Sequence, residues 1–382
     1  MKQIVCLATS PWYPIPTRKQ QIMSRLHDAE VLYFDPSVSI IAPIKDRSAL
    51  AHCKAYRKPG EKVADHITVY ALPPVLPFFN KYRWINRLNQ KRMAAYVRKV
   101  MKRHGFDKPV LWTYSPVCAD LVDHVPHSAL VYDCVDRHSA YGGLMNPQLV
   151  DQMEMDLAAK SDMVFATADS LCQRLKTANP KAAFIPNGAN FELFSKAAES
   201  RPMPQELQTL EGPILGFVGA LQSCIEYGWV VHAAKARPQW NFVFIGKEKP
   251  GVDLSALRAL PNVHFLGLKP HEQLPDYLAA FDVCLNLFAS GDLSKDVSPL
   301  KFYEYLATGK PIVSTPQPDQ VLQYESIMQV ARTPEEFIDC CAQAIEDTTP
   351  ERVNARMEAG RQSSWDARVA QMESMLKEMN IL

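Results

Sequence analysis

The sequence lacks the features that would mark a membrane-spanning, secreted or nucleic-acid-binding chain. Nowhere do about 18 apolar residues follow one another, the length that a helix needs to cross a bilayer. The first ten residues, MKQIVCLATS, carry one lysine and too short an apolar core for a signal peptide. The formal net charge is +1, so no overall field favours a polyanion such as nucleic acid. We therefore expect a cytoplasmic chain, with peripheral rather than spanning contact to any membrane.

The nine cysteines also lack the spacing of a metal site or a disulfide framework. They are dispersed, none forms a C-x-x-C pair, and no histidine cluster lies at ligand spacing from them. Cysteines that are odd in number and placed in apolar runs are typical of small buried side chains in a reducing compartment. We accordingly expect no metal-binding residues.

The chain has 382 residues, which is too long for one ordinary core and suits two domains. Short β-branched runs alternate with longer amphipathic stretches, a pattern that predicts doubly wound parallel sheets. The expected strands of the first half are residues 4–8, 31–34, 66–71, 110–114, 129–132, 163–166 and 183–185. The expected strands of the second half are residues 214–218, 242–245, 263–265, 283–287 and 311–314. The expected helices are residues 18–26, 86–104, 147–159, 229–236, 274–280, 300–308 and 364–379.

A polar, proline-bearing segment without apolar periodicity separates the two alternating series. We expect an N-terminal domain over 1–195, a linker over 196–213, a C-terminal domain over 214–362, and a C-terminal helix over 363–382 that packs back on the first domain. The predicted fold class is α/β, with two Rossmann-like, doubly wound parallel-sheet domains facing a cleft. Ligands of such sheets bind beyond the carboxyl ends of the strands, so the loops there are the candidate sites.

Residues 296–309, DVSPLKFYEYLATG, predict a helix with an anion site at its start. Ser298 suits the N-cap and Pro299 the first helical position, and a glycine and a proline follow the end of the pattern. The first-turn amides of Leu300 and Lys301 have no partner within the helix. Together with the positive end of the helix dipole and the lysine side chain, they favour an anion.

Glu304 lies one turn beyond Lys301 on the same helix face. A carboxylate is a poor ligand for phosphate but a good acceptor for the two hydroxyl donors of a ribose. A cation and a carboxylate in this order describe a site for a nucleotide-diphosphate sugar. A capped surface helix with an incidental Lys–Glu pair is the structural alternative, and the spacing does not decide between the two.

The segment SPLKFYEYLATGKPIVST resembles the donor-site helix of GT-B glycosyltransferases, especially family 4 and its bacterial polysaccharide relatives. The E-x7-E pattern of that family falls on Asp296 and Glu304, with aspartate in place of the first glutamate. The segment AAFIPNGANFELF is similar to the end of the family's first domain, through Asn187 and Gly188, and NVHFLGLKPHEQLPDYLAAFDVCLNLF is also typical. The likeness spans most of the chain and keeps its order.

The chain departs from the family pattern in two places. Family 4 enzymes commonly carry an arginine and a lysine after the first strand of the second domain, where this chain reads GFVGALQSCIEYGW. Their Gly-Gly loop after the first strand is replaced by TSPWYPIPTR. At these places, and at VYDCVD, the chain more closely resembles a bacterial subgroup of teichuronic-acid and exopolysaccharide transferases. Lys301 is then expected to carry more of the diphosphate charge.

The resemblance implies a hexosyltransferase that moves a sugar, with retention, from a UDP-linked donor to a hydroxyl of a saccharide or lipid-linked acceptor in bacterial surface polysaccharide synthesis. No cofactor is expected beyond the nucleotide-sugar co-substrate, and no DxD-type carboxylate pair that would hold a metal stands at a suitable strand end. The expected donor-binding residues are Lys301, Glu304, Asp296, Ser298, Leu300, Gly246, Lys247, Gly267 and Lys269.

The stretch VYDCVDRHSAY follows an expected strand of the first domain and places Asp136 and His138 beyond its carboxyl end. A carboxylate or an imidazole there can orient or deprotonate an acceptor hydroxyl, so these are the first and second catalytic candidates. A loop cap or a helix-start residue is the structural alternative. Trp12, Tyr13 and Arg18 follow the first strand and are the acceptor-binding candidates, because aromatic rings suit sugar stacking. Packing at the rim of the sheet is their alternative.

Residues 72–104 hold nine lysines and arginines and no acid, with four aromatic residues near the start. A basic amphipathic helix of this kind suits the surface of an anionic bilayer. The acceptor would then be lipid-linked and delivered at the inner leaflet. The membrane candidates are Arg83, Trp84, Arg87 and Lys91. The alternative is a solvated helix that packs on the sheet through Ile85, Leu88, Ala95 and Val100.

Two other functions fit the sequence. A nucleotide-sugar epimerase on the same fold would need no acceptor and would leave the basic helix unexplained. A catalytically silent nucleotide-sugar-binding partner in a polysaccharide assembly complex stays open because of the two departures from the family pattern. A nicotinamide dehydrogenase does not fit, because GFVGAL lacks the G-x-G-x-x-G spacing of a pyrophosphate turn.

Overall fold

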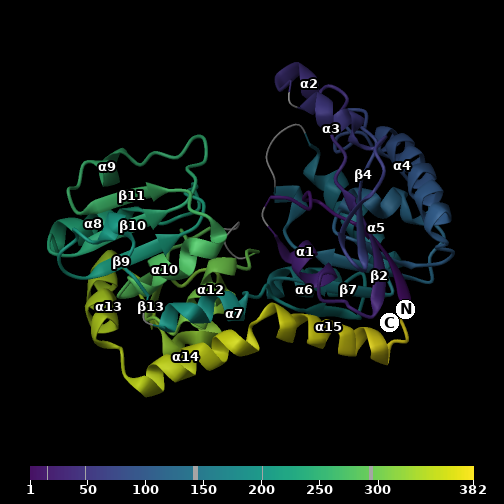
Figure 1. Ribbon diagram of the computed structural model, residues 1–382. Helices are drawn as coiled ribbons and strands as arrows, with labels where there is room; N and C mark the ends of the chain where they lie inside the picture. The colour runs from purple at the N-terminus through teal and green to yellow at the C-terminus, as the bar shows by residue number, and fades with distance from the viewer. Residues whose placement is uncertain (15, 48, 141–144, 200, 292–295) are drawn as a thin grey trace. The chain divides into compact units, whose positions relative to one another are not determined.

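The computed structural model describes residues 1–14, 16–47, 49–140, 145–199, 201–291 and 296–382. The chain forms two compact units, one made of Met1–Pro186 with Val369–Leu382 and the other of Asn187–Arg368. Each unit is an α/β structure built around a sheet of its own (Figure 1). The predicted class, two Rossmann-like domains with parallel sheets, is confirmed.

The sheet of the first unit has eight strands in the order β3-β4-β2-β1-β5-β6-β7-β8. Its strands are β1 (Lys2–Leu7), β2 (Ala29–Asp35), β3 (Glu61–Ala64), β4 (Ile67–Ala71), β5 (Val110–Thr113), β6 (Ala129–Cys134), β7 (Met163–Ala166) and β8 (Ala182–Phe184). All neighbours are parallel except β3 and β4. From β1 the chain builds the sheet first toward β2 and later toward β5, so the strand order reverses between β1 and β5. Ligands of open parallel sheets bind at such a reversal.

Helices cover both faces of this sheet, because side chains along a strand point alternately to one face and the other. Apolar side chains of α4, α5 and α6 pack on one face, and those of α1 and the C-terminal helix α15 pack on the other. These helices are α1 (Arg18–Met23), α4 (Arg83–His104), α5 (Pro147–Lys160), α6 (Asp169–Lys176) and α15 (Trp365–Glu378). Two short helices, α2 (Ala42–Lys45) and α3 (Ala49–Ala55), follow β2. The end of the chain, from Val369, thus belongs to the first unit.

The sheet of the second unit has six strands in the order β11-β10-β9-β12-β13-β14, all parallel. Its strands are β9 (Ile214–Val218), β10 (Asn241–Ile245), β11 (Val263–Gly267), β12 (Val283–Asn286), β13 (Ile312–Ser314) and β14 (Gln329–Val330). Its helices include α7 (Phe191–Phe194), α8 (Gly228–Ala236), α9 (Ser255–Arg258), α10 (Leu274–Ala279), α12 (Leu300–Thr308), α13 (Pro334–Glu346) and α14 (Pro350–Gln362). Here the strand order reverses between β9 and β12.

The boundary between the units lies elsewhere than the sequence predicts. It falls between Pro186 and Asn187 instead of at residue 195, and the chain returns at Val369 instead of at residue 363. The segment 196–213, expected to be a linker, belongs to the second unit, and its Leu207 is fully buried in the same apolar cluster as Phe194. Isolated apolar residues in a polar segment show no periodicity, so the sequence did not reveal that this segment packs.

Candidate functional site

Three glycines lie at the carboxyl ends of β9, β10 and β11. Gly219, Gly246 and Gly267 have φ angles of 145°, 152° and 68°, which residues with a side chain rarely adopt. The amide of Gly219 donates to the carbonyl of Ile245, and the amide of Gly246 donates to the carbonyl of Gly267, each at 2.8 Å. A Cβ on Gly246 would lie 1.9 Å from the carbonyl oxygen of Gly219. The loops after these strands therefore approach one another more closely than side chains allow.

Lys301 lies where the strand order of the second sheet reverses. Its Nζ is 4.3 Å from the ring centre of Phe217 on β9 and 4.5 Å from that of Phe288, which follows β12. The faces of both rings attract a cation. Burial lowers the pKa of Lys301 to about 8, although Cys224 and Glu304 act in the opposite direction. No carboxylate of the described residues forms an ion pair with this ammonium, so its charge is available to an anionic ligand.

The start of α12 differs in one respect from the prediction. Ser298 does not cap the helix, because Pro299 precedes its first turn and the Ser298 hydroxyl accepts a hydrogen bond from the backbone N–H of Asn187 at 2.9 Å. The carbonyl of Ser298 accepts a second bond, of 2.8 Å, from Asn187 Nδ2. The N-cap role expected for Ser298 is therefore wrong. The amides of Leu300 and Lys301 find no acceptor within the described parts of the chain and remain as donors at the helix start.

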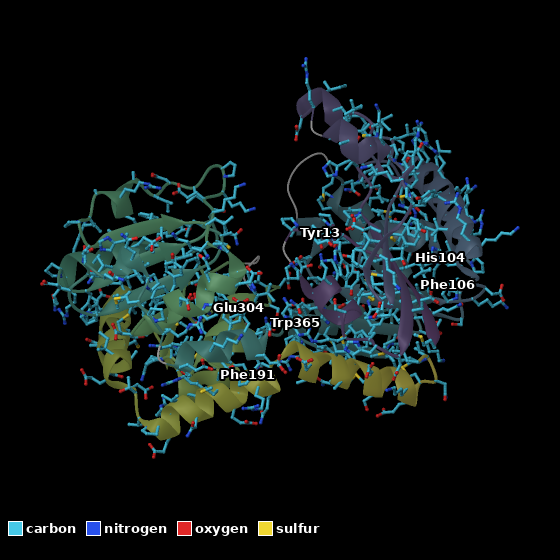
Figure 2. The ribbon with its side chains drawn as sticks, viewed as in Figure 1. Tyr13, His104, Phe106, Phe191, Glu304 and Trp365 are labelled. Atoms are coloured by element: carbon cyan, nitrogen blue, oxygen red, sulfur yellow. The ribbon has the colours of Figure 1, made fainter. Side chains whose placement is uncertain are left out.

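Glu304, one turn into α12, faces His271 (Figure 2 labels Glu304). The distance from His271 Nε2 to Glu304 Oε1 is 3.6 Å, and the neighbouring Glu304 carboxylate raises the pKa of His271 while burial opposes the shift. The Glu304 side chain is 16% exposed, so its carboxylate keeps access to a ligand. His271 was not among the predicted residues, although it directly follows the loop 267–270 that the sequence placed at this edge.

The other predicted donor residues are less well placed. Lys269 pairs with Glu206 at 2.6 Å and lies 5.3 Å from the ring centre of Tyr277. The charge of Lys269 is thus already balanced by a carboxylate, and its expected place in the donor site, beside the base, stays a prediction. Lys247 is exposed in the loop after β10. Asp296 is buried and directly follows residues 292–295, which lie outside the described residues.

The first unit holds a cavity of about 390 Å³ beyond the carboxyl ends of β1, β5 and β6. Both catalytic candidates, Asp136 and His138, line it, and so does Lys19 of α1, which the sequence did not single out. Thr9, after β1, and Ser115, after β5, also line it, so the cavity lies at the reversal of strand order in this sheet.

His138 is held by its contact with the backbone of Tyr114. Its Nε2 lies 3.0 Å from the carbonyl oxygen of Tyr114, which can only accept, so Nε2 carries a proton. Burial lowers the pKa of His138, although Asp136 and Glu154 act in the opposite direction. The ring is therefore neutral near pH 7, and its Nδ1 has the lone pair that a general base needs.

Arg18 forms a buried ion pair within the first unit. Its Nε donates to both carboxylate oxygens of Asp133 on β6, at 2.9 and 3.1 Å, and its NH1 group donates to the carbonyl of Pro186 at 3.1 Å. The side chains of Arg18 and Asp133 are 2% and 0% exposed. The acceptor contact predicted for Arg18 is therefore contradicted, because the guanidinium is buried and joins α1 to the sheet.

The two aromatic candidates after β1 differ in their surroundings. Trp12 packs edge-on against Tyr33 with ring centres 5.0 Å apart, and its amide donates to Asp35 at 2.8 Å. Tyr13 is 57% exposed, and its hydroxyl lies 3.4 Å from a carboxylate oxygen of Glu61 (Figure 2 labels Tyr13). Neither residue lines the cavity of the first unit. Their acceptor role stays a prediction.

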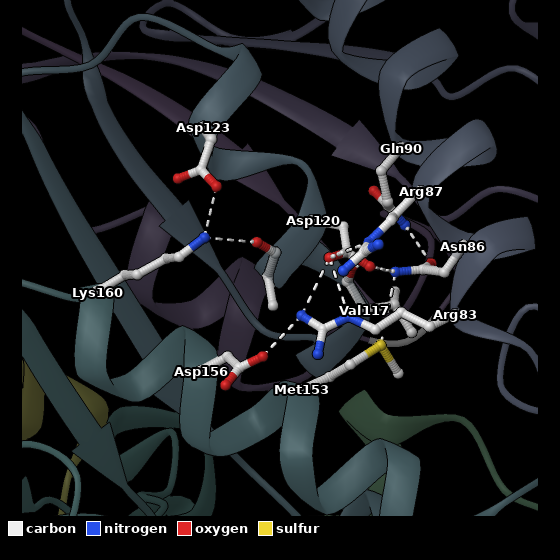
Figure 3. A network of polar contacts seen from close by, with 11 residues as sticks. Arg83, Asn86, Arg87, Gln90, Val117, Asp120, Asp123, Met153, Asp156 and Lys160 are labelled. Atoms are coloured by element: carbon white, nitrogen blue, oxygen red, sulfur yellow. Dashed lines mark hydrogen bonds and ion pairs between the residues drawn. The ribbon is translucent and has the colours of Figure 1, made fainter.

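The basic helix α4 is anchored to its unit by polar contacts near its start (Figure 3). Arg83 pairs with Asp120 at 3.1 Å and with Asp156 at 2.7 Å, and Arg87 lies 3.7 Å from Asp120. Arg83 is therefore committed to internal carboxylates, whereas the Arg87 side chain is 64% exposed. The membrane contact predicted for Arg83 is not supported.

The buried face of α4 includes polar residues that the apolar pattern did not predict. The buried residues are Ile85, Asn86, Asn89, Gln90, Met93, Ala94, Val97, Val100 and Met101. Leu88 and Ala95, expected on this face, are exposed. Side-chain amides take three of the inner positions. Asn89 bonds to both backbone groups of Leu76, Asn86 bonds to Val117 and Asp120, and Gln90 donates to Asn86. Among the described residues, none of the helices is both long and apolar enough to span a bilayer.

Comparison with known proteins adds a family match and a fold match. Residues 212–347 match the family model described as Glycosyl transferases group 1. The putative teichuronic acid biosynthesis glycosyltransferase TuaH of Bacillus subtilis (strain 168) is 29% identical over 202 residues, which cover 50% of this chain and 51% of that protein. The match thus spans about half the length of this curated relative.

Solved structures resemble the chain over nearly its full length. Sucrose-phosphate synthase from Thermosynechococcus elongatus has a TM-score of 0.71 at 15% identity, covering 100% of this chain and 99% of that one. Anabaena HepE in complex with UDP and glucose has a TM-score of 0.65 at 18% identity, covering 99% and 100%. A trehalose-6-phosphate protein from E. coli bound with UDP-2-fluoro glucose has a TM-score of 0.71 at 11% identity, covering 98% and 99%. These likenesses show the GT-B fold. Residues 212–347 are thus similar to the group 1 glycosyl transferases, and the chain as a whole has the GT-B fold, in agreement with the resemblance seen in the sequence.

Proposed function

We propose that this chain transfers a sugar from a UDP-linked donor to a hydroxyl group of a saccharide or lipid-linked acceptor in bacterial surface polysaccharide synthesis. One observation carries the proposal: the ammonium of Lys301 lies between two aromatic rings, without a carboxylate partner among the described residues, in the first turn of α12. A nearby cation and open helix-start amides suit a diphosphate. The UDP-bound relatives of the same fold support a uridine donor, and the TuaH relative supports a polysaccharide role.

The residues proposed to bind the donor, Lys301 and the first amides of α12, act on the leaving group. As the bond from the anomeric carbon to the diphosphate oxygen breaks, negative charge collects on the diphosphate, and Lys301 and the amides of α12 stabilise it there. Such fixed donors bind the transition state more strongly than the ground state, so they raise the rate as well as the affinity. Glu304 accepts hydrogen bonds from the ribose hydroxyls and holds the nucleoside in place.

The proposed catalytic residues, Asp136 and His138, act on the attacking hydroxyl of the acceptor. The acceptor oxygen forms a bond to the anomeric carbon, UDP leaves, and the hydroxyl proton passes to Asp136 or to the neutral imidazole of His138, which line one cavity. Retention of configuration at the anomeric carbon is part of the proposal and follows from the family resemblance. Independence of a metal cofactor stays a prediction, to be checked by assaying turnover in the presence of a chelator.

The proposed location is the cytoplasm, with peripheral contact to the inner face of the plasma membrane through α4. Trp84 and Leu88, four residues apart on this helix, are 67% and 45% exposed, and the exposed Lys91 follows them. An aromatic and an aliphatic side chain beside a lysine suit an anionic interface.

The test begins with a thermal-shift series of UDP-, GDP- and ADP-sugars, since a tighter ligand raises the melting temperature more. UDP-sugars are expected to give the largest shift, and the best one is then assayed for transfer to a membrane extract. Lys301→Ala is expected to abolish the shift, whereas the matched control Lys235→Ala, at an exposed lysine of the same unit, is expected to retain it. Donor turnover without any acceptor would favour the epimerase, and donor binding without turnover would favour a silent partner.

A further inference from the structure

Lys19 is a buried cation without a hydrogen-bond partner in the described part of the chain. It is 7% exposed, and its Nζ lies 5.3 Å from the ring centre of Tyr114. No hydrogen bond or ion pair joins its ammonium to another described residue. An ammonium has three donors to satisfy, and burying one without acceptors costs free energy. A ligand that brings acceptors would remove this cost.

The charged groups around Lys19 differ in whether a partner of opposite charge already balances them. Asp133 is neutralised by Arg18, whose Nε contacts both of its carboxylate oxygens. Burial lowers the pKa of Lys19, Arg18 acts in the same direction, and Asp133 and Asp136 oppose the shift. Asp136 lies at the same cavity, but no ion pair forms between it and Lys19. The ammonium thus remains available to the cavity.

The cavity has the size and the lining of a sugar subsite. Its volume of about 390 Å³ is in the range of small-ligand pockets. Thr9, Asn80 and Ser115 bring polar groups for sugar hydroxyls, and Phe79 and Met145 bring apolar surface for the faces of a ring. Lys19 adds the positive charge, so the cavity combines the elements that a charged sugar needs.

We propose that this cavity binds an acceptor sugar that carries an anionic group, either the carboxylate of a uronic acid or a phosphate ester, and that Lys19 holds that group. The inference rests on the proposed function and specifies the chemical class of the acceptor. The anion supplies the acceptors that the ammonium lacks. Asp136 and His138 line the same cavity, so a sugar held by its anion presents its hydroxyls to them.

A different role for Lys19 gives a different result. If the lysine only balances the negative charge of Asp136, a neutral sugar binds as well as an anionic one. Selectivity for charge therefore separates the two roles, and it can be measured on the unaltered protein.

The first experiment is isothermal titration of the full chain, saturated with UDP, with glucose, glucuronate and glucose 6-phosphate. At least one of the two anionic sugars is expected to bind about tenfold tighter than glucose, and the tighter one identifies carboxylate or phosphate as the source of the anion. Equal affinity for glucose and both anionic sugars would overturn the inference.

The second experiment compares Lys19→Met with Lys108→Met, an exposed lysine of the same unit. Lys19→Met is expected to lose the preference for the anionic sugar while its affinity for glucose stays unchanged, and Lys108→Met is expected to behave as the unaltered chain. Retained preference in a folded Lys19→Met protein would overturn the assignment to Lys19. If Lys19→Met does not fold, Lys19→Arg, which keeps the charge, must retain the preference.

Parallel titrations with UDP alone separate this inference from the proposed function. Normal UDP binding without charge selectivity refutes the anionic subsite and leaves the transferase proposal intact. Charge selectivity without UDP binding refutes the transferase proposal and leaves a sugar-acid or sugar-phosphate site in the first unit.

Discussion

Asn187 and Ser298 are joined by two hydrogen bonds, although 111 residues separate them in the chain. The bonds run from the backbone and the side-chain amide of Asn187 to the hydroxyl and the carbonyl of Ser298. The next residue, Gly188, lies so close to the chain at Ser363 that a Cβ would meet its carbonyl oxygen at 2.8 Å. Asn187 therefore holds Ser298, two residues before the start of α12, and Gly188 allows the close approach to Ser363.

Asn187→Ala should loosen the start of α12. The substitution leaves the carbonyl of Ser298 without its buried donor, which costs about 1–3 kcal/mol of unfolding free energy. We expect lower stability in urea and weaker UDP binding. Asn190→Ala is the control, because Asn190 caps the neighbouring helix α7 through the amide of Leu193 and does not contact Ser298. UDP affinity that falls equally in both variants would contradict a specific role for Asn187.

Donor binding should weaken as the pH rises above about 8, the pKa of Lys301 in the free protein. Below that pH the ammonium is charged and ready for the diphosphate. Above it, binding must take up a proton, which costs up to about tenfold in affinity per pH unit until the pKa of the bound state is reached. The diphosphate itself stays ionised here, since the second pKa of a phosphate is about 6. Titration calorimetry with UDP from pH 7.5 to about 9.5 measures the effect.

Lys301→Met should remove that pH dependence and lower UDP affinity at pH 7.5 by at least about tenfold. It should also raise the melting temperature near neutral pH, because a charged group held in an apolar setting no longer has to be desolvated. Lys235→Met serves as the control and should change neither property. A steep pH dependence that persists in Lys301→Met would assign the titration to another group.

Glu304→Gln should weaken UDP binding while leaving 2′,3′-dideoxy-UDP nearly unaffected. The carboxylate accepts hydrogen bonds from the ribose diol, and an amide accepts them less strongly. The pKa of His271 should fall in the same variant, because Glu304 raises it, and NMR titration of the imidazole follows that change. Glu358→Gln, at an exposed acid of α14, is the control. Equal losses for both nucleotides would mean that Glu304 does not bind the ribose.

Arg18→Met should destabilise the first unit by about 3–5 kcal/mol, because it leaves Asp133 charged and buried without a partner. The double variant Arg18→Met with Asp133→Leu should recover part of the loss, since no unpaired charge remains. Urea unfolding of both proteins measures the difference. Unchanged stability of Arg18→Met together with a raised KM for the acceptor would instead support the acceptor-binding role that the sequence suggested for Arg18.

Replacing Trp84 by alanine and Lys91 by glutamate should reduce co-sedimentation with vesicles that contain anionic lipid. The first change removes apolar surface and the second reverses a charge, so each weakens interfacial binding. Lys235→Glu, in the other unit, controls for net charge. Binding that is indifferent to the anionic lipid content of the vesicles would remove the membrane proposal.

The predicted strands were found where short apolar runs are buried on both faces of a sheet, as in β1, β6 and β9. The edge strand β3 was missed, because its residues are polar and mostly exposed and give no apolar run. Helix α12 was predicted from the proline at its start and the glycine after its end, which are local features. The N-cap role of Ser298 was predicted incorrectly, because local chemistry does not reveal its partner Asn187, which lies far away in the sequence.

The sequence alone, through its local patterns, determined that this chain forms two α/β units with parallel sheets. It also determined that a lysine and a glutamate share one face of a helix that begins after a proline. Such features depend on neighbours within a few residues, so they can be read from the order of the amino acids. The tertiary structure alone decided which charged side chains are buried and which of them are paired. Arg18 forms a buried ion pair, whereas the adjacent Lys19 lines a cavity. Lys301 lies between the rings of Phe217 and Phe288. These depend on which distant side chains meet, and nothing in the local pattern distinguishes a lysine in solvent from one enclosed by the fold.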